Sequence, residues 1–135
     1  MKELTLEAKI ESLQEVLEFV DTELEGLDCP MKTQMQIDVA VEEMYVNVAH
    51  YAYAPGVGMV TITLDFNEDS RQVAITFIDG GVPFDPTAKE DPDVTLSAQE
   101  RQIGGLGIYM VKKSMDEMVY RYEDEKNILT ITKRI

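Results

Sequence analysis

The 135-residue sequence contains no tryptophan, one cysteine and one histidine. Because Cys29 is alone, an internal disulfide and a cysteine-based metal cluster are both excluded. No apolar run approaches the roughly 18 residues that a membrane span needs, and the first residues lack the charged and apolar regions of a secretory signal. These absences favour a cytoplasmic protein folded as a single domain over residues 1–135.

Cationic side chains are also scarce, with 12 Lys and Arg against 26 Asp and Glu, which gives a net charge of −14. A surface of this sign repels nucleic acid and anionic lipid. We therefore expect neither direct nucleic-acid binding nor membrane binding. A phosphate-bearing ligand would need local neutralisation by a metal ion, by backbone N–H groups or by a few placed cations.

The spacing of apolar residues predicts the order of helices and strands. Leu4, Leu6 and Ala8 alternate as in a first strand, and Ser12 with Glu15 forms a capping-box pattern before a helix. The further expected elements are a helix over 31–51, strands over 60–66 and 73–79, a helix over 106–117, and strands over 119–123 and 128–135. This order predicts an α+β fold, a two-layer sandwich of a mixed, mostly antiparallel sheet with helices on one face.

The second predicted helix carries Glu43 and Asn47 one turn apart, at the edge of its apolar stripe. A carboxylate there suits proton transfer, and an amide oxygen suits binding of a hard cation. On spacing alone, a solvated helix face explains the pair equally well.

The second central strand ends in Asp79-Gly80-Gly81. The carboxylate can accept a hydrogen bond from an exocyclic amine, and glycine lets the backbone approach a flat ring closely. An ordinary turn after a strand is the alternative.

A glycine-rich segment, Gly104-Gly105-Leu106-Gly107, leads directly into the last predicted helix. Free N–H groups at a helix N-terminus bind phosphate. The stretch of residues 80–104 before it has no sustained periodicity, which is typical of a functional loop.

In this order the three segments resemble the N box and the two glycine boxes of the GHKL ATPases, the superfamily with the histidine-kinase-type ATPase fold. The residues around them, such as His50, Tyr53 and Asp85, look most like those of the anti-sigma-factor serine/threonine-protein kinases. The resemblance covers nearly the whole chain.

The resemblance implies a role for each matched residue. Glu43 is the implied general base, and Asn47 is the implied Mg²⁺ ligand. Asp79 is implied to hold the adenine amino group. The implied nucleotide-binding set is Asn47, Asp79, Gly81, Phe84, Arg101, Gly104, Gly105, Leu106 and Gly107. Within this set Arg101 is a phosphate-binding cation by its place beside the glycines, and a solvated surface arginine is the alternative.

The resemblance further implies an ATP-dependent kinase, with ATP and Mg²⁺ as cofactors, that phosphorylates a small anti-sigma-factor antagonist and binds a sigma factor. Members of the family commonly dimerise, which leaves the oligomeric state of this chain open. A regulatory module that binds ATP and a partner without transferring phosphate is the alternative. We do not expect a complete histidine kinase, because the chain lacks a dimerisation helix pair bearing a phosphoacceptor histidine. We do not expect a gyrase- or MutL-type protein either, because the length leaves no room for a transducer domain.

One position departs from the superfamily pattern. Many members begin the last strand with Gly-Thr, whose hydroxyl helps to bind adenine, whereas this chain has Asn127-Ile128. Whether Thr130 replaces that hydroxyl is open at this level.

Overall fold

The computed structural model describes residues 1–88 and 105–135, with the backbone alone for Gly105 and Leu106. Most of the predicted loop between the glycine boxes, including Arg101 and Gly104, lies outside the described residues.

In the described part of the chain, five strands form one sheet in the order β1-β2-β3-β5-β4, and each pairing is antiparallel. The strands are β1 (Lys2–Glu7), β2 (Met59–Asn67), β3 (Gln72–Asp79), β4 (Glu117–Glu123) and β5 (Lys126–Arg134). Alternation determines which side chains face the core, because successive residues of a strand point to opposite faces. In β3, for example, Val73, Ile75 and Phe77 are buried, while the residues between them are half-buried.

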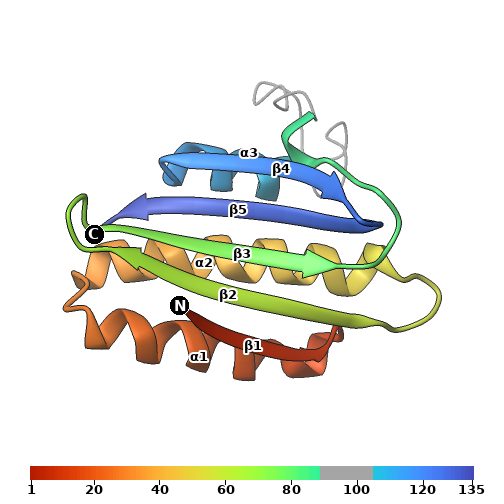
Figure 1. Cartoon of the computed structure of the whole chain (residues 1–135), viewed down its shortest axis with the longest axis horizontal. Helices are drawn as coiled ribbons and strands as arrows, with labels where there is room; N and C mark the ends of the chain where they lie inside the picture. The colour runs from red at the N-terminus through yellow and green to blue at the C-terminus, as the bar shows by residue number, and fades with distance from the viewer. Residues whose placement is uncertain (89–104) are drawn as a thin grey trace.

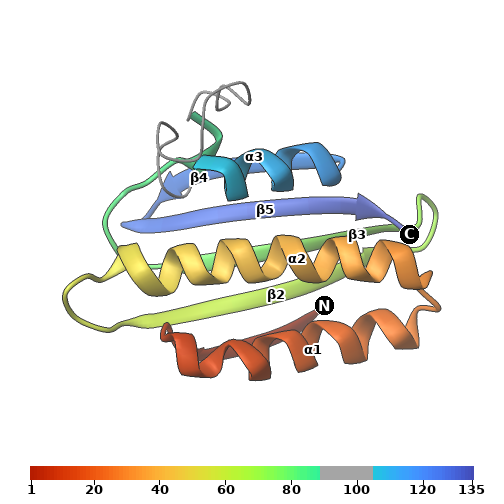
Figure 2. The same cartoon turned by 180° about the vertical axis from the view of Figure 1, so that it is seen from behind.

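Within the described residues, three α-helices cover one face of the sheet and leave the other face open (Figure 1, Figure 2). They are α1 (Leu13–Gly26), α2 (Met31–Asn47) and α3 (Gly105–Ser114). Their buried residues recur at helical spacing, so that each helix presents one apolar stripe to the sheet. The prediction of helices on one face of a mostly antiparallel sheet is confirmed. None of the helices in the described ranges is long and apolar enough to cross a bilayer.

The first helix begins directly after Ser12, as predicted, but its predicted cap and the predicted end of the last helix are wrong. The Ser12 side chain makes no capping hydrogen bond, because a 3₁₀ turn, η1 (Ile10–Ser12), runs directly into α1 and gives Ser12 helical dihedral angles. The last helix ends at Ser114 rather than at 117, since Glu117 already pairs with Thr132 as the first residue of β4.

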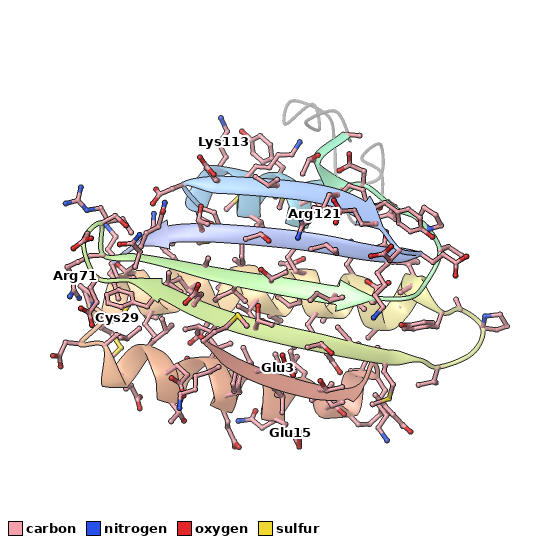
Figure 3. All side chains as sticks on the ribbon, in the orientation of Figure 1. Glu3, Glu15, Cys29, Arg71, Lys113 and Arg121 are labelled. Carbon is pink, nitrogen blue, oxygen red and sulfur yellow. The ribbon has the colours of Figure 1, made fainter. Side chains whose placement is uncertain are left out.

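The predicted functional segments meet at one end of the sheet. The end of β3, the start of β5 and the start of α3 all lie there, together with η2 (Val48–Ala52), a π-helical turn that continues α2. The opposite end carries Arg71 and Cys29 (Figure 3), where Arg71 Nη2 donates a hydrogen bond to the Leu27 carbonyl at 3.1 Å. The predicted functional segments therefore lie at the end of the sheet opposite Arg71 and Cys29.

Candidate functional site

A pocket of about 340 Å³ lies at this end, between the C-terminal end of α2 and the sheet. Its lining is Met44, Asn47, Val48, Tyr51, Ala52, Phe77, Asp79, Val82, Pro83, Phe84, Pro86, Tyr120, Asn127 and Leu129. Most of these side chains are apolar, and a few polar groups converge among them. This combination is the usual form of a small-molecule site.

Asp79 is the polar group that β3 delivers to the pocket. It is the last residue of the strand and only 5% exposed. Its Oδ1 accepts hydrogen bonds from the Gly81 N–H and from Asn127 Nδ2, both at 2.9 Å. Among the described residues these donors meet the same oxygen, so Oδ2 is the atom that a donor on a ligand can engage. The exocyclic amine of a nucleobase is such a donor.

Gly81 is held against the backbone of η2. A Cβ at Gly81 would collide with the Ala52 carbonyl, and the neighbouring Val82 N–H donates to that same carbonyl at 2.9 Å. The sequence predicted that this glycine makes room for a flat ring. In the structure its lack of a side chain makes room for Ala52, and the π-helical turn brings Ala52 close.

Glu43 and Asn47 lie one turn apart on α2, as predicted, but they face different neighbours. Asn47 is half-buried and lines the pocket. Glu43 is exposed, and its carboxylate lies where a Cβ on Gly107 would stand. The contact between α2 and α3 thus brings the first predicted motif against the last.

The phosphate-binding segment is described only in part. Gly105, Leu106 and Gly107 form the first turn of α3. The N-terminus of α3 lies at the same end of the sheet as the C-terminal end of α2 (Figure 2). The free N–H groups and the positive end of a helix dipole attract anions at such a position. The predicted contributions of Arg101 and Gly104 lie outside the described residues.

The segment that follows Gly81 forms one wall of the pocket. Phe84 is 38% exposed and its backbone N–H donates to Asn127 Oδ1 at 3.1 Å. Asp85 Oδ1 accepts from the Thr87 N–H at 2.8 Å and from the Thr87 hydroxyl at 2.5 Å, at the start of the 3₁₀ turn η3 (Pro86–Ala88). Asp85 therefore orders this wall, and its Oδ1 is occupied by Thr87.

Tyr53 ties the loop before β2 to the end of β3. Its hydroxyl donates to the Met59 carbonyl at 2.6 Å and accepts from the Gly80 N–H at 2.7 Å. The ring fills the space that a side chain at Gly58 would need. The sequence marked Tyr53 only as part of the resemblance, and the structure gives it a positioning role beside Asp79.

Asn127 is a buried polar pocket residue to which the sequence analysis assigned no role. It is 6% exposed, lines the pocket and pairs with Asp79 across β3 and β5. The one signal for it was the departure from the Gly-Thr pattern at this position. Thr130 does not replace the missing threonine, because it lies on the open face of the sheet, where its hydroxyl is 2.9 Å from that of Thr76.

The residues at the pocket fit a magnesium ion only in a limited way. Within the described ranges there is no group of three or more His, Cys, Asp or Glu side chains that could hold a metal. Mg²⁺ is often held by one or two protein oxygens together with substrate phosphates and water. The Asn47 carbonyl oxygen suits that arrangement, provided that the nucleotide supplies most of the ligands.

Comparison with known proteins shows which sequences this chain is similar to. The family described as the histidine kinase-like ATPase domain matches residues 6–133. The chain is 27% identical over 101 residues to the serine/threonine-protein kinase BtrW of Bordetella bronchiseptica, which covers 75% of this chain and 70% of that protein. It is 32% identical over 104 residues to the serine-protein kinase RsbW of Listeria monocytogenes, which covers 73% of this chain and 64% of that protein.

A solved structure with a similar fold is the SiaB–SiaC complex from Pseudomonas aeruginosa. The superposition has a TM-score of 0.60 and covers 98% of this chain and 89% of that chain, at 16% sequence identity. This likeness concerns the fold alone. The family match and the two sequence matches confirm the resemblance that the N box and the glycine boxes indicate.

Proposed function

Because this chain belongs to the family of histidine kinase-like ATPase domains, we propose that it is a magnesium- and ATP-dependent serine kinase acting on a small partner protein. The proposed substrate is an anti-sigma-factor antagonist. The proposed second partner is a sigma factor, released or bound according to the state of the antagonist.

The observation that carries this proposal is that α2 links the pocket to the first turn of α3, because Asn47 lines the pocket and Glu43, one turn earlier on the same helix, lies against Gly107. Asp79 lines the pocket, while Glu43 lies against Gly107 in the first turn of α3. An adenine ring in the pocket would donate from its amino group to Asp79 Oδ2. Its phosphates would then extend toward the N–H groups of α3, beside the Glu43 carboxylate.

The chemistry follows from that arrangement. Glu43 accepts the proton of the attacking serine hydroxyl as the oxygen bonds to the γ-phosphorus, and the bond to the ADP oxygen breaks. Asn47 is the residue that would hold Mg²⁺, which neutralises phosphate charge when bound. Local neutralisation matters in a chain of net charge −14.

The relatives support both parts of the proposal. BtrW and RsbW are named as kinases of serine, or of serine and threonine. The similar fold in the SiaB–SiaC complex occurs in an assembly of two different proteins. A kinase that works by binding and releasing a protein partner agrees with both.

The test is transfer of label from ATP to candidate antagonist proteins encoded by neighbouring genes. We expect phosphoserine on one of them, dependent on Mg²⁺ and abolished by EDTA. Replacing Asn47→Ala should remove the dependence of nucleotide affinity on Mg²⁺. If the wild-type chain binds a partner in an ATP-dependent way and transfers no phosphate, the chain is a regulatory module rather than a kinase.

A further inference from the structure

Asn127 lies at the centre of a buried hydrogen-bond network beside the pocket. It pairs directly with Asp79 in the register of β3 and β5. Side chains of directly paired residues on neighbouring strands lie on the same face of the sheet, within contact distance. For these two residues that face is the covered one, where both are almost fully buried.

Each hydrogen-bonding position of the Asn127 amide is occupied by the protein. Nδ2 donates to Asp79 Oδ1 and to the Val82 carbonyl, both at 2.9 Å. Oδ1 accepts from the Phe84 N–H at 3.1 Å and from the Tyr120 hydroxyl at 2.5 Å. An amide has two donor and two acceptor positions, so none is left for a ligand, and any influence of Asn127 on a ligand must pass through these neighbours.

We propose that Asn127 is a positioning residue that sets the base selectivity of the pocket, by fixing the Asp79 carboxylate and the 82–84 backbone in one arrangement. The proposal rests on the proposed ATP-binding function. Asn127 holds Asp79 Oδ1, so that Oδ2 meets the ligand as an acceptor. An acceptor at this point selects a base with an amino group over one with a carbonyl oxygen.

The chemistry of the amide suits this role better than the alternatives. A threonine hydroxyl has one proton to donate and cannot reach Asp79 and Val82 together, whereas a carboxylate would place like charges side by side. Burial raises the pKa of Tyr120, and the charges of Asp85 and Asp79 add to the effect. Tyr120 therefore stays a neutral donor to the Asn127 oxygen at physiological pH.

The test compares the affinity for ATP with that for inosine triphosphate, in which a carbonyl oxygen replaces the 6-amino group. Wild-type protein should prefer ATP. Asn127→Ala should lower ATP affinity by about tenfold or more and inosine triphosphate affinity much less, so that the preference shrinks. Thr130→Ala is the matched control, because it alters the same strand on the opposite face, and it should keep the wild-type preference.

Asn127→Asp provides a second readout that keeps the size of the side chain. Two adjacent carboxylates repel unless they share a proton. The affinity of this variant for ATP, relative to wild type at each pH, should therefore rise as the pH falls from about 8 to about 6. If circular dichroism shows that Asn127→Ala does not fold, the pH dependence of Asn127→Asp alone tests the proposal.

These measurements test the positioning role of Asn127 separately from the proposed ATP-binding function. If Asn127→Ala weakens both nucleotides by the same factor, or if Asn127→Asp shows the wild-type pH profile, Asn127 is only structural and the inference is overturned. If wild-type protein binds neither nucleotide, the proposed function itself fails.

Discussion

The carboxylate of Glu43 occupies the space that a side chain at Gly107 would need. The two residues are 64 positions apart in the chain, and the packing of α2 against α3 brings them together. The proposed general base is therefore held against the turn that is proposed to bind the phosphates. This relationship makes the position of Glu43 depend on the absence of a side chain at 107.

Gly107→Ala should consequently separate stability from activity. The Glu43 carboxylate is the far end of a flexible side chain and can move away, while alanine favours helix over glycine by up to about 1 kcal/mol. We expect an unchanged or higher melting temperature and a phosphotransfer rate lowered by about 10- to 100-fold. Calorimetric titration with ATP would distinguish a displaced base from a blocked phosphate. If Gly107→Ala transfers phosphate at the wild-type rate, the contact of Glu43 with residue 107 is not needed for activity.

Gly81→Ala should behave in the opposite way. Here the added methyl group meets the Ala52 carbonyl, which is backbone and cannot rotate aside. We expect a loss of about 1–3 kcal/mol in the free energy of unfolding, as for overpacked sites, together with weaker ATP binding. Denaturant melts measure the first effect. Gly26→Ala, where no atom of the described residues lies within 4 Å of an added Cβ, is the control and should not destabilise. A fully stable Gly81→Ala protein would show that the contact with η2 is not maintained in solution.

The surroundings of Asp38 in α2 lead us to expect that the free energy of unfolding depends on pH. One oxygen of this half-buried carboxyl has no hydrogen-bond partner among the described residues. Burial raises the pKa of Asp38 from 3.8 to about 7, and a hydrogen bond to Asp21 and the charges of Asp21 and Glu25 add to the effect. At a pH between 3.8 and about 7, the folded chain binds more protons at Asp38 than the unfolded chain does. The free energy of unfolding should therefore fall as the pH rises through this window and level off above it.

Asp38→Asn removes this titration while its amide can still donate to Asp21. The variant should flatten the pH profile and be more stable than wild type at pH about 8 by roughly 1–2 kcal/mol, less than the full shift implies because the site is partly solvated. Thermal melts at several pH values measure it. Glu15→Gln changes the charge equally at an exposed position of α1 and is the control. If the stability of the wild-type protein varies with pH in parallel with that of Asp38→Asn, the pKa of Asp38 is not raised.

The strands and helices were predictable because their apolar residues repeat with a clear period. Val60, Ile62 and Leu64 alternate in β2 as in a strand with one buried face, and Ile37 and Val41 recur in α2 at helical spacing. The helix ends were less predictable. Glu117 fits a helical pattern locally, but pairing with β5 places it in a strand.

Some residues of the candidate site were likewise predictable from the sequence, and others were not. Glu43, Asn47 and Asp79 belong to compact motifs that local spacing reveals. Asn127 has no local pattern around it, and its role arises from the register that sets it opposite Asp79, 48 positions earlier in the chain. Asp38 likewise resembles a solvated helix residue until packing brings α1 beside it.

The central claim is that Glu43 takes the proton of the attacking hydroxyl, and Glu43→Gln tests it with the least disturbance. Glutamine keeps the size and a carbonyl oxygen but cannot accept a proton at neutral pH. Glu42→Gln is the matched control, since this neighbour is also exposed and points about 100° away around the helix.

The decisive measurement is the rate of phosphate transfer from saturating magnesium-ATP to a confirmed partner protein. Glu43→Gln should bind ATP as wild type does and lose about 10²–10⁴ in rate, toward the lower value because the loose transition state relies mainly on positioning. Glu42→Gln should match wild type. Transfer by Glu43→Gln at the wild-type rate would contradict the account.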